Sequence, residues 1–191
     1  FNFLYVGDPQ IGSSNDVESD SQGWQATVTT AHSTFPDAGF LLSLGDQVEK
    51  GSREDEYEGF FSPEELPNIP VAPTIGNHDN RSGLYAYHFN CPNESSDYGV
   101  TAQDDGIVGG NYYFTYGNTL FMVINSNNAN LAEHAAFFSS VENNAEVMEG
   151  IVWEVVVMHV SMYSSAAHSD DTDISTYRQY ISPLFDQFNI D

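Results

Sequence analysis

Short apolar runs alternate with longer amphipathic segments along the chain. The apolar runs are bounded by glycine, proline or polar residues, a pattern typical of buried strands. They predict strands within residues 1–7, 39–46, 69–79 and 151–158. Two more strand-like runs lie on either side of Gly117-Asn118, a two-residue hairpin signal, so these two strands should be antiparallel neighbours.

The amphipathic segments carry apolar residues at helical spacing. They predict helices within residues 22–35, 52–61, 130–148 and 172–189. Pro183 should kink or divide the last of these helices, because proline removes a backbone donor. Residues 80–110 are rich in Asn, Asp, Ser and Gly and are expected to form a long loop. Strands that alternate with helices predict an α/β layered fold in one domain, residues 1–191.

The charge of the chain is strongly one-sided. Its 191 residues include 28 acidic and 4 basic residues, which gives a net charge of −24. Such a surface repels nucleic acid and anionic membranes and favours cations. Adaptation to a salty or extracellular medium explains the same charge, and we expect the protein to be extracellular or at the cell surface. No run of 18 apolar residues occurs, so no membrane insertion is expected.

The single cysteine and two helical histidines indicate structural roles. Cys91 has no second cysteine with which to form a disulfide within the chain, and it is expected to be a packed thiol. His32 and His134 lie on predicted helices and are expected to face solvent.

Polar residues that can bind metal ions follow the predicted strands. These residues are Asp8, Gln10, Asp46, Asn77, His78, Asp79 and His159. In open α/β folds, ligands bind beyond the carboxyl ends of the strands. Carboxylates, amide oxygens and imidazoles together favour divalent metals such as Zn, Mn or Fe. A pair of such ions about 3.5–4 Å apart can stabilise both oxygens of an in-line phosphoryl displacement.

The order of these residues resembles the motif series of one enzyme superfamily. "GDPQIG" (7–12), "GDQVE" (45–49), "GNHD" (76–79) and an apolar strand that ends in "MH" (158–159) resemble the calcineurin-like metallophosphoesterases. The resemblance is strongest to a secreted bacterial group on the purple-acid-phosphatase side of that superfamily. It covers essentially the whole chain and implies a layered β-sandwich flanked by helices.

The resemblance implies a set of metal ligands. Asp8 would bind the first metal, Asp46 would bridge both metals, and Asn77 and His159 would bind the second. Gln10 stands where many relatives carry a histidine ligand, so it would be a weak ligand or lie just outside the ligand set.

The resemblance also implies catalytic roles. His78 would reach toward the leaving-group oxygen as an acid or phosphate stabiliser, and Asp79 would orient it. Glu49 occupies the place of the tyrosine that colours purple acid phosphatases, so the protein is expected to be colourless or pale even with iron bound.

One part of the family pattern is missing. Relatives have a final strand that leads to a Gly-His-x-His motif, and each of its histidines binds one metal. The motif does not occur in this sequence, and His168 lies in a Ser- and Asp-rich segment that is no substitute for it. We therefore expect a fragment that lacks its last strands. Its open edge would pair with the missing C-terminal segment or with a second copy.

These observations lead to two functional hypotheses. The first is a dinuclear metal-dependent phosphoesterase that hydrolyses phosphomonoesters, with a small phosphorylated substrate and a metal-bridging hydroxide as nucleophile. The second is a catalytically degraded or incomplete domain that serves as a structural or binding segment of a larger surface protein. Gln10 in place of histidine and the missing terminal motif favour the second hypothesis.

Overall fold

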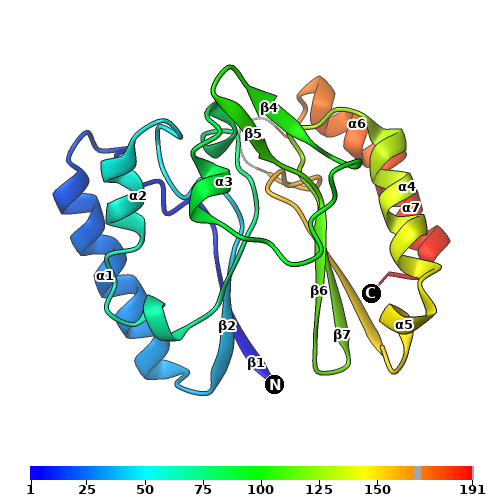
Figure 1. Ribbon diagram of the computed structural model, residues 1–191, viewed down its shortest axis with the longest axis horizontal. Helices are drawn as coiled ribbons and strands as arrows, with labels where there is room; N and C mark the ends of the chain where they lie inside the picture. Colours follow the sequence, from blue (N-terminus) through cyan, green and yellow to red (C-terminus); the bar gives the residue numbers. More distant parts are fainter. Residues whose placement is uncertain (166–168, 191) are drawn as a thin grey trace. The chain divides into compact units, whose positions relative to one another are not determined.

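The computed structural model describes residues 1–165 and 169–190. They divide into two compact units, the first formed by residues 1–90 and 102–108 and the second by residues 91–101 and 109–190. Each unit combines strands with helices, which confirms the expected mixed α/β fold (Figure 1). No helix within these described ranges is long and apolar enough to cross a membrane.

The first unit is built on a parallel sheet with the order β1-β2-β3. Its strands are β1 (Asn2–Val6), β2 (Ala38–Ser43) and β3 (Val71–Pro73). The central strand β2 is the most apolar, and Phe40, Leu41 and Leu42 are buried. Because the strands are parallel, the segments that follow them leave the sheet at the same edge.

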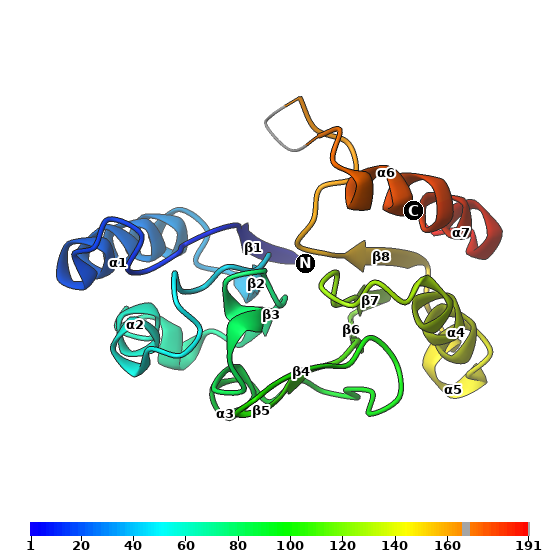
Figure 2. The same ribbon diagram turned by 90° about the horizontal axis from the view of Figure 1, so that it is seen from above.

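Two helices cover one face of this sheet (Figures 1 and 2). They are α1 (Val17–Thr34) and α2 (Glu54–Phe60). Asp16 caps α1, since its carboxylate accepts a hydrogen bond from the Ser19 N–H at 3.1 Å. The buried Trp24 of α1 joins the two helices: its indole N–H donates to the carbonyl of Phe60 at 2.8 Å, and the two rings stack.

The segment expected to be a long loop contains short elements. They are η2 (Asp79–Arg81), α3 (Tyr85–His88), β4 (Thr101–Gln103) and β5 (Gly106–Gly109), preceded by η1 (Leu66–Asn68). In the first unit, the carboxylate of Asp105 accepts hydrogen bonds from the Ser82 hydroxyl and the Gly83 N–H. Polar composition hides this order from sequence patterns, because side-chain hydrogen bonds such as these, together with a few scattered buried side chains such as Tyr85 and Phe89, hold the segment.

The second unit has a mixed sheet with the order β6-β7-β8. Its strands are β6 (Tyr112–Tyr116), β7 (Thr119–Val123) and β8 (Trp153–Val157). β6 and β7 pair in antiparallel fashion around Gly117-Asn118, which confirms the predicted hairpin, whereas β7 and β8 are parallel. The helices between β7 and β8 are α4 (Leu131–Glu142) and α5 (Ala145–Met148).

The core of the second unit lies between β7 and its helices. Leu120, Met122 and Ile124 pack with the aromatic residues of α4 and with Tyr177 of α6 (Thr172–Tyr180). Helix α7 (Ser182–Phe188) follows α6, so the predicted helix is divided next to Pro183 as expected. The predicted helix over 130–148 is also divided, because the side chain of Asn144 caps a new helix by accepting from the Glu146 and Val147 N–H groups.

The solvent-facing position expected for His134 is wrong. The residue is fully buried in the second unit, where Nε2 donates to the carbonyl of Asn128 at 2.9 Å and Nδ1 accepts from the side-chain amide of Asn111 at 3.1 Å. Both ring nitrogens therefore have partners, so the imidazole is neutral, and burial lowers its pKa.

Candidate metal centre

The segments that follow β1 and β2 continue side by side beyond the sheet. The Asp8 N–H donates to the carbonyl of Gly45 at 3.2 Å. Two residues further, the Gln10 N–H donates to the carbonyl of Asp46 at 2.8 Å. An isolated parallel bridge between Ile11 and Val48 extends the same pairing. These hydrogen bonds bring two predicted ligands, Asp8 and Asp46, into register.

The carboxylates of these two residues lie close together. An oxygen of Asp8 and an oxygen of Asp46 are within 4.8 Å of each other. Asp8 is exposed, whereas Asp46 is only 5% exposed. The hydrogen bond that Asp46 Oδ1 accepts from the His78 N–H, at 2.8 Å, brings the segment after β3 to the same place.

The backbone is strained at three of the predicted site residues. Asp8, Gln10 and Asp46 have φ angles of 50°, 46° and 51°, in the left-handed region. Side chains other than glycine rarely adopt this region, and each instance costs on the order of 1 kcal/mol or more. A cluster of such residues beside a pair of carboxylates is typical of a functional site.

Gly76, the first residue of "GNHD", allows the close approach of these segments. A Cβ atom at this position would lie 2.1 Å from Asp46 Oδ1 and 2.2 Å from the Asp46 backbone nitrogen. Only glycine fits here without displacing the backbone of a predicted ligand.

The buried side chain of Asp79 links the segment after β2 to the segment after β3. It is fully buried, and its carboxylate accepts hydrogen bonds from the Gln47 N–H at 3.0 Å and the Gly76 N–H at 2.9 Å. Burial, helped by the negative charge of Asp46, raises the pKa of the Asp79 carboxyl to about 7, and the Gly76 N–H opposes this rise.

The imidazole of His78 is held by Glu49, whereas the family resemblance implied Asp79 as its partner. His78 Nδ1 lies 2.7 Å from the backbone carbonyl oxygen of Glu49 and 3.4 Å from Glu49 Oε2. Gln10 Nε2 donates to Glu49 Oε2 at 2.9 Å and lies 3.2 Å from His78 Nε2. Sequence reasoning missed this grouping, although the "GDQVE" spacing already placed Glu49 three residues after Asp46.

The two remaining predicted ligands, Asn77 and His159, follow other strands. Asn77 is exposed and directly precedes His78 in the first unit. His159 belongs to the second unit and follows the end of β8 after Met158. His168 lies outside the described residues.

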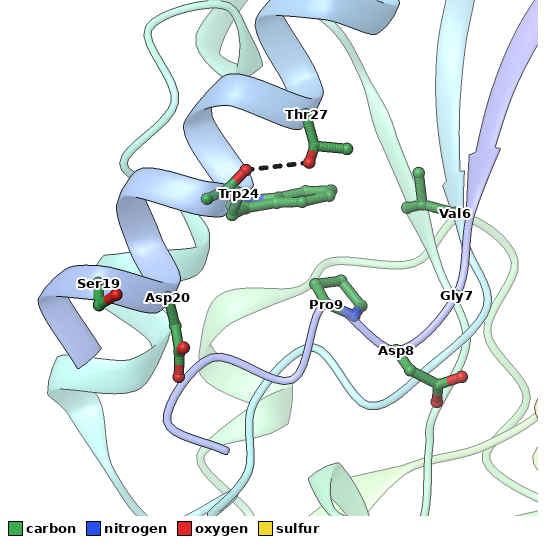
Figure 3. A pocket seen from close by; sticks show the side chains of 9 residues that line it. Val6, Gly7, Asp8, Pro9, Ser19, Asp20, Trp24 and Thr27 are labelled. Carbon is green, nitrogen blue, oxygen red and sulfur yellow. Dashed lines mark hydrogen bonds between the residues drawn. The ribbon is translucent and has the colours of Figure 1, made fainter. Parts of the chain in front are cut away.

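A pocket flanks the segment after β1 (Figure 3). Val6, Pro9, Asp20 and Trp24 are among the residues that line it. The ring of Pro9 lies between Asp8 and the indole, and the Asp8 side chain points away from Trp24. The Asp20 carboxylate is already occupied by the Gly12 and Ser14 N–H groups. The pocket therefore lies between this segment and α1, and the Asp8 carboxylate points away from its Trp24 wall.

The residues of the first unit fit a divalent cation. The adjacent carboxylates of Asp8 and Asp46 provide oxygen donors that repel one another unless a cation lies between them. The left-handed backbone of both residues and the close packing of Gly76 against Asp46 fix these donors in place. Carboxylate and amide oxygens of this kind suit hard or borderline divalent metals.

The similarity to known families agrees with this chemistry. A family model described as calcineurin-like phosphoesterase matches residues 1–191. No curated protein matches the sequence.

Proposed function

The chain belongs to the calcineurin-like phosphoesterase family of metal-dependent hydrolases, and on this premise we propose that it hydrolyses phosphomonoesters with two metal ions. The observation that carries the proposal is the pair formed by Asp8 and Asp46, whose carboxylate oxygens are within 4.8 Å of each other. Zn²⁺, Mn²⁺ and iron are the metals that suit this donor set.

The proposed ligands follow from the family resemblance. Asp8 would bind one ion, Asp46 would bridge two, and Asn77 and His159 would complete the second ion's ligand set. Bound cations would polarise the phosphoryl oxygens and activate a water molecule. The acidic residues of the chain disfavour a polyanionic substrate such as nucleic acid and favour a small phosphorylated one.

His78 is the residue proposed to act on the leaving group. Its Nε2 lies 4.0 Å from Asp46 Oδ2, so the imidazole stands beside the proposed bridging ligand. From there, once Nε2 carries a proton, the ring would donate it to the phosphoryl or leaving-group oxygen. The buried Asp79 would support it indirectly, by joining the segments that carry Asp46 and His78.

The test compares Asp46→Asn with a matched control, Asp37→Asn, which removes the same charge from an exposed position. After chelation, the chain is supplied with Zn²⁺, Mn²⁺ or Fe²⁺ and given p-nitrophenyl phosphate or bis-p-nitrophenyl phosphate. We expect hydrolysis of the monoester, a loss of about 100-fold or more in kcat/KM for Asp46→Asn, and no change for the control.

Three results would contradict the proposal. Full activity of Asp46→Asn would show that the proposed metal centre is not required for hydrolysis. Hydrolysis of the diester alone would leave a phosphoesterase of a different substrate class. Absence of hydrolysis with every metal, together with absence of metal binding, would favour the structural or binding segment of a larger protein instead.

A further inference from the structure

We propose that Gln10 and Glu49 form a hydrogen-bonded pair that positions His78, and that Gln10 serves this purpose instead of binding metal. The inference rests on the proposed function for its catalytic consequence, but the contacts that carry it belong to the first unit alone. It concerns the two residues at which the chain departs from its family's pattern.

The orientation of the Gln10 amide follows from its partner. Gln10 Nε2 lies 2.9 Å from Glu49 Oε2. An ionised carboxylate only accepts hydrogen bonds, so the atom facing it must be the amide nitrogen. The second N–H of the same group faces His78 Nε2 at 3.2 Å. Both donors of the Gln10 amide are therefore in use.

The tautomer of His78 follows in the same way. Its Nδ1 lies 2.7 Å from the backbone carbonyl oxygen of Glu49, which can only accept. The ring proton of the neutral imidazole is thus on Nδ1, and the lone pair of Nε2 is free to accept from Gln10. Two independent contacts give the same tautomer, and together they hold the ring at both nitrogens.

The backbone fixes the two positioning residues as firmly as it fixes the proposed ligands. The Gln10 N–H donates to the carbonyl of Asp46, and the Glu49 N–H donates to the carbonyl of Ile11 at 2.9 Å. The left-handed φ of 46° at Gln10 sets the direction of its side chain. The side chains of His78 and Glu49 are only 17% and 26% exposed, so water competes weakly for their hydrogen bonds.

The pair accounts for the glutamine where relatives have a histidine ligand. The amide nitrogen, which is tied to Glu49 and His78, contributes to the placement of the imidazole. The amide oxygen, through which a metal would bind, is a weaker donor than the imidazole that relatives carry at this position. Glu49 is then a positioning residue too, since its carboxylate holds Gln10 and its carbonyl holds the ring. A ring displaced by a fraction of an ångström would slow the chemical step without weakening substrate binding.

The experiment uses the full chain and variants that remove single contacts. Gln10→Met keeps the length of the side chain but loses both donors. Glu49→Met loses the acceptor for Gln10, whereas Glu49→Gln retains one. Gln187→Met, at an exposed position of α7, is the matched control. Circular dichroism confirms that each variant is folded.

The first measurement needs no metal and no activity. Long-range ¹H–¹⁵N spectra are recorded on the metal-free chain at about pH 8, above the ordinary titration range of histidine, with His78→Ala for assignment. We expect the Nε2 resonance of His78 to move downfield in Gln10→Met and Glu49→Met, because Nε2 loses its donor. It should stay in place in Glu49→Gln and in the control.

The second measurement separates positioning from metal binding. Equivalents of bound Zn²⁺ should be unchanged in Gln10→Met and Glu49→Met, while kcat for p-nitrophenyl phosphate falls about 10- to 100-fold with KM unchanged. A loss of bound Zn²⁺ in Gln10→Met, or an Nε2 resonance that does not move, would overturn the inference. If the unaltered chain hydrolyses nothing, the proposed function fails while the spectra still decide the hydrogen bonds.

Discussion

Gly76 packs directly against Asp46: a Cβ atom on Gly76 would lie 2.1 Å from Asp46 Oδ1 and 2.2 Å from its backbone nitrogen. We predict that Gly76→Ala destabilises the first unit by about 1–3 kcal/mol, because the clash involves backbone that cannot move aside. Urea unfolding of the variant and the unaltered chain measures the difference.

Gly23→Ala is the matched control. Gly23 lies within α1, and a Cβ there would meet nothing within 4 Å. Alanine should stabilise this helix by about 0.5–1 kcal/mol, since glycine costs that much in a helix interior. Equal effects of the two substitutions would show that Gly76 is not required for the approach to Asp46.

Asp8→Asn should stabilise the metal-free chain while it removes activity. The nearby carboxylates of Asp8 and Asp46 repel each other, and replacing one with an amide relieves up to about 1 kcal/mol of that repulsion. Thermal unfolding in chelator should therefore show a higher midpoint for the variant. Addition of Zn²⁺ should raise the midpoint of the unaltered chain more, and the opposite order would argue against a cation at this pair.

From the neighbouring carboxyl groups of Glu142 and Glu154, we predict that the free energy of unfolding decreases as pH rises. Burial, followed by a hydrogen bond with Glu154 and its negative charge, raises the pKa of Glu142 from 4.5 to about 8. The folded chain thus holds this proton more tightly than the unfolded chain. The resulting stabilisation is complete below about pH 4.5 and is lost as pH rises through about 8.

Glu142→Gln should flatten this dependence, and urea midpoints between about pH 5 and 9 provide the measurement. Glu146→Gln, at an exposed position of α5, should leave it unchanged. If both variants keep the slope of the unaltered chain, the half-buried pair of Glu142 and Glu154 is not its source.

From the buried imidazole of His134, we predict a separate decrease in the free energy of unfolding in acid. Burial lowers the pKa of this imidazole from 6.5, so the folded chain favours the neutral ring. Its stabilisation is present above about pH 6.5 and is lost as pH falls through the lowered value.

Glutamine can reproduce both hydrogen bonds of His134 without titrating. His134→Gln should therefore weaken the acid dependence at a small cost at neutral pH. His134→Ala should cost about 1–3 kcal/mol, because it takes the imidazole acceptor away from the buried side-chain amide of Asn111 and leaves the Asn128 carbonyl with the Tyr177 hydroxyl alone. Similar acid unfolding curves for His134→Gln and the unaltered chain would contradict this role.

The strands and the hairpin were predictable because each depends on local signals. Apolar runs bounded by glycine gave β1 and β2, and Gly117-Asn118 gave the turn between β6 and β7. The division of the last helix followed from Pro183 alone. Features that depend on side-chain hydrogen bonds were not predictable, such as the cap of α5 by Asn144 and the burial of His134.

The same distinction holds at the candidate metal centre. The register of Asp8 and Asp46 could be expected, since both follow parallel strands in similar Gly-Asp sequences. The partners of His78 could not, because an imidazole, an amide and a carboxylate from separate segments combine in many ways. The family resemblance implied Asp79 as the partner, but the carboxylate of Asp79 accepts hydrogen bonds from the backbone N–H groups of Gln47 and Gly76.

The pairing of the segments after β1 and β2 also limits how this protein can vary in length. Asp8, Gln10 and Ile11 each donate a backbone hydrogen bond to a residue within 45–47, so one residue inserted into either segment would turn its carboxylate to the opposite side. Insertions in homologues should therefore fall elsewhere, for example at the Gly117-Asn118 turn. A homologue with a longer spacing between the first strand and its aspartate would be expected to have lost the metal.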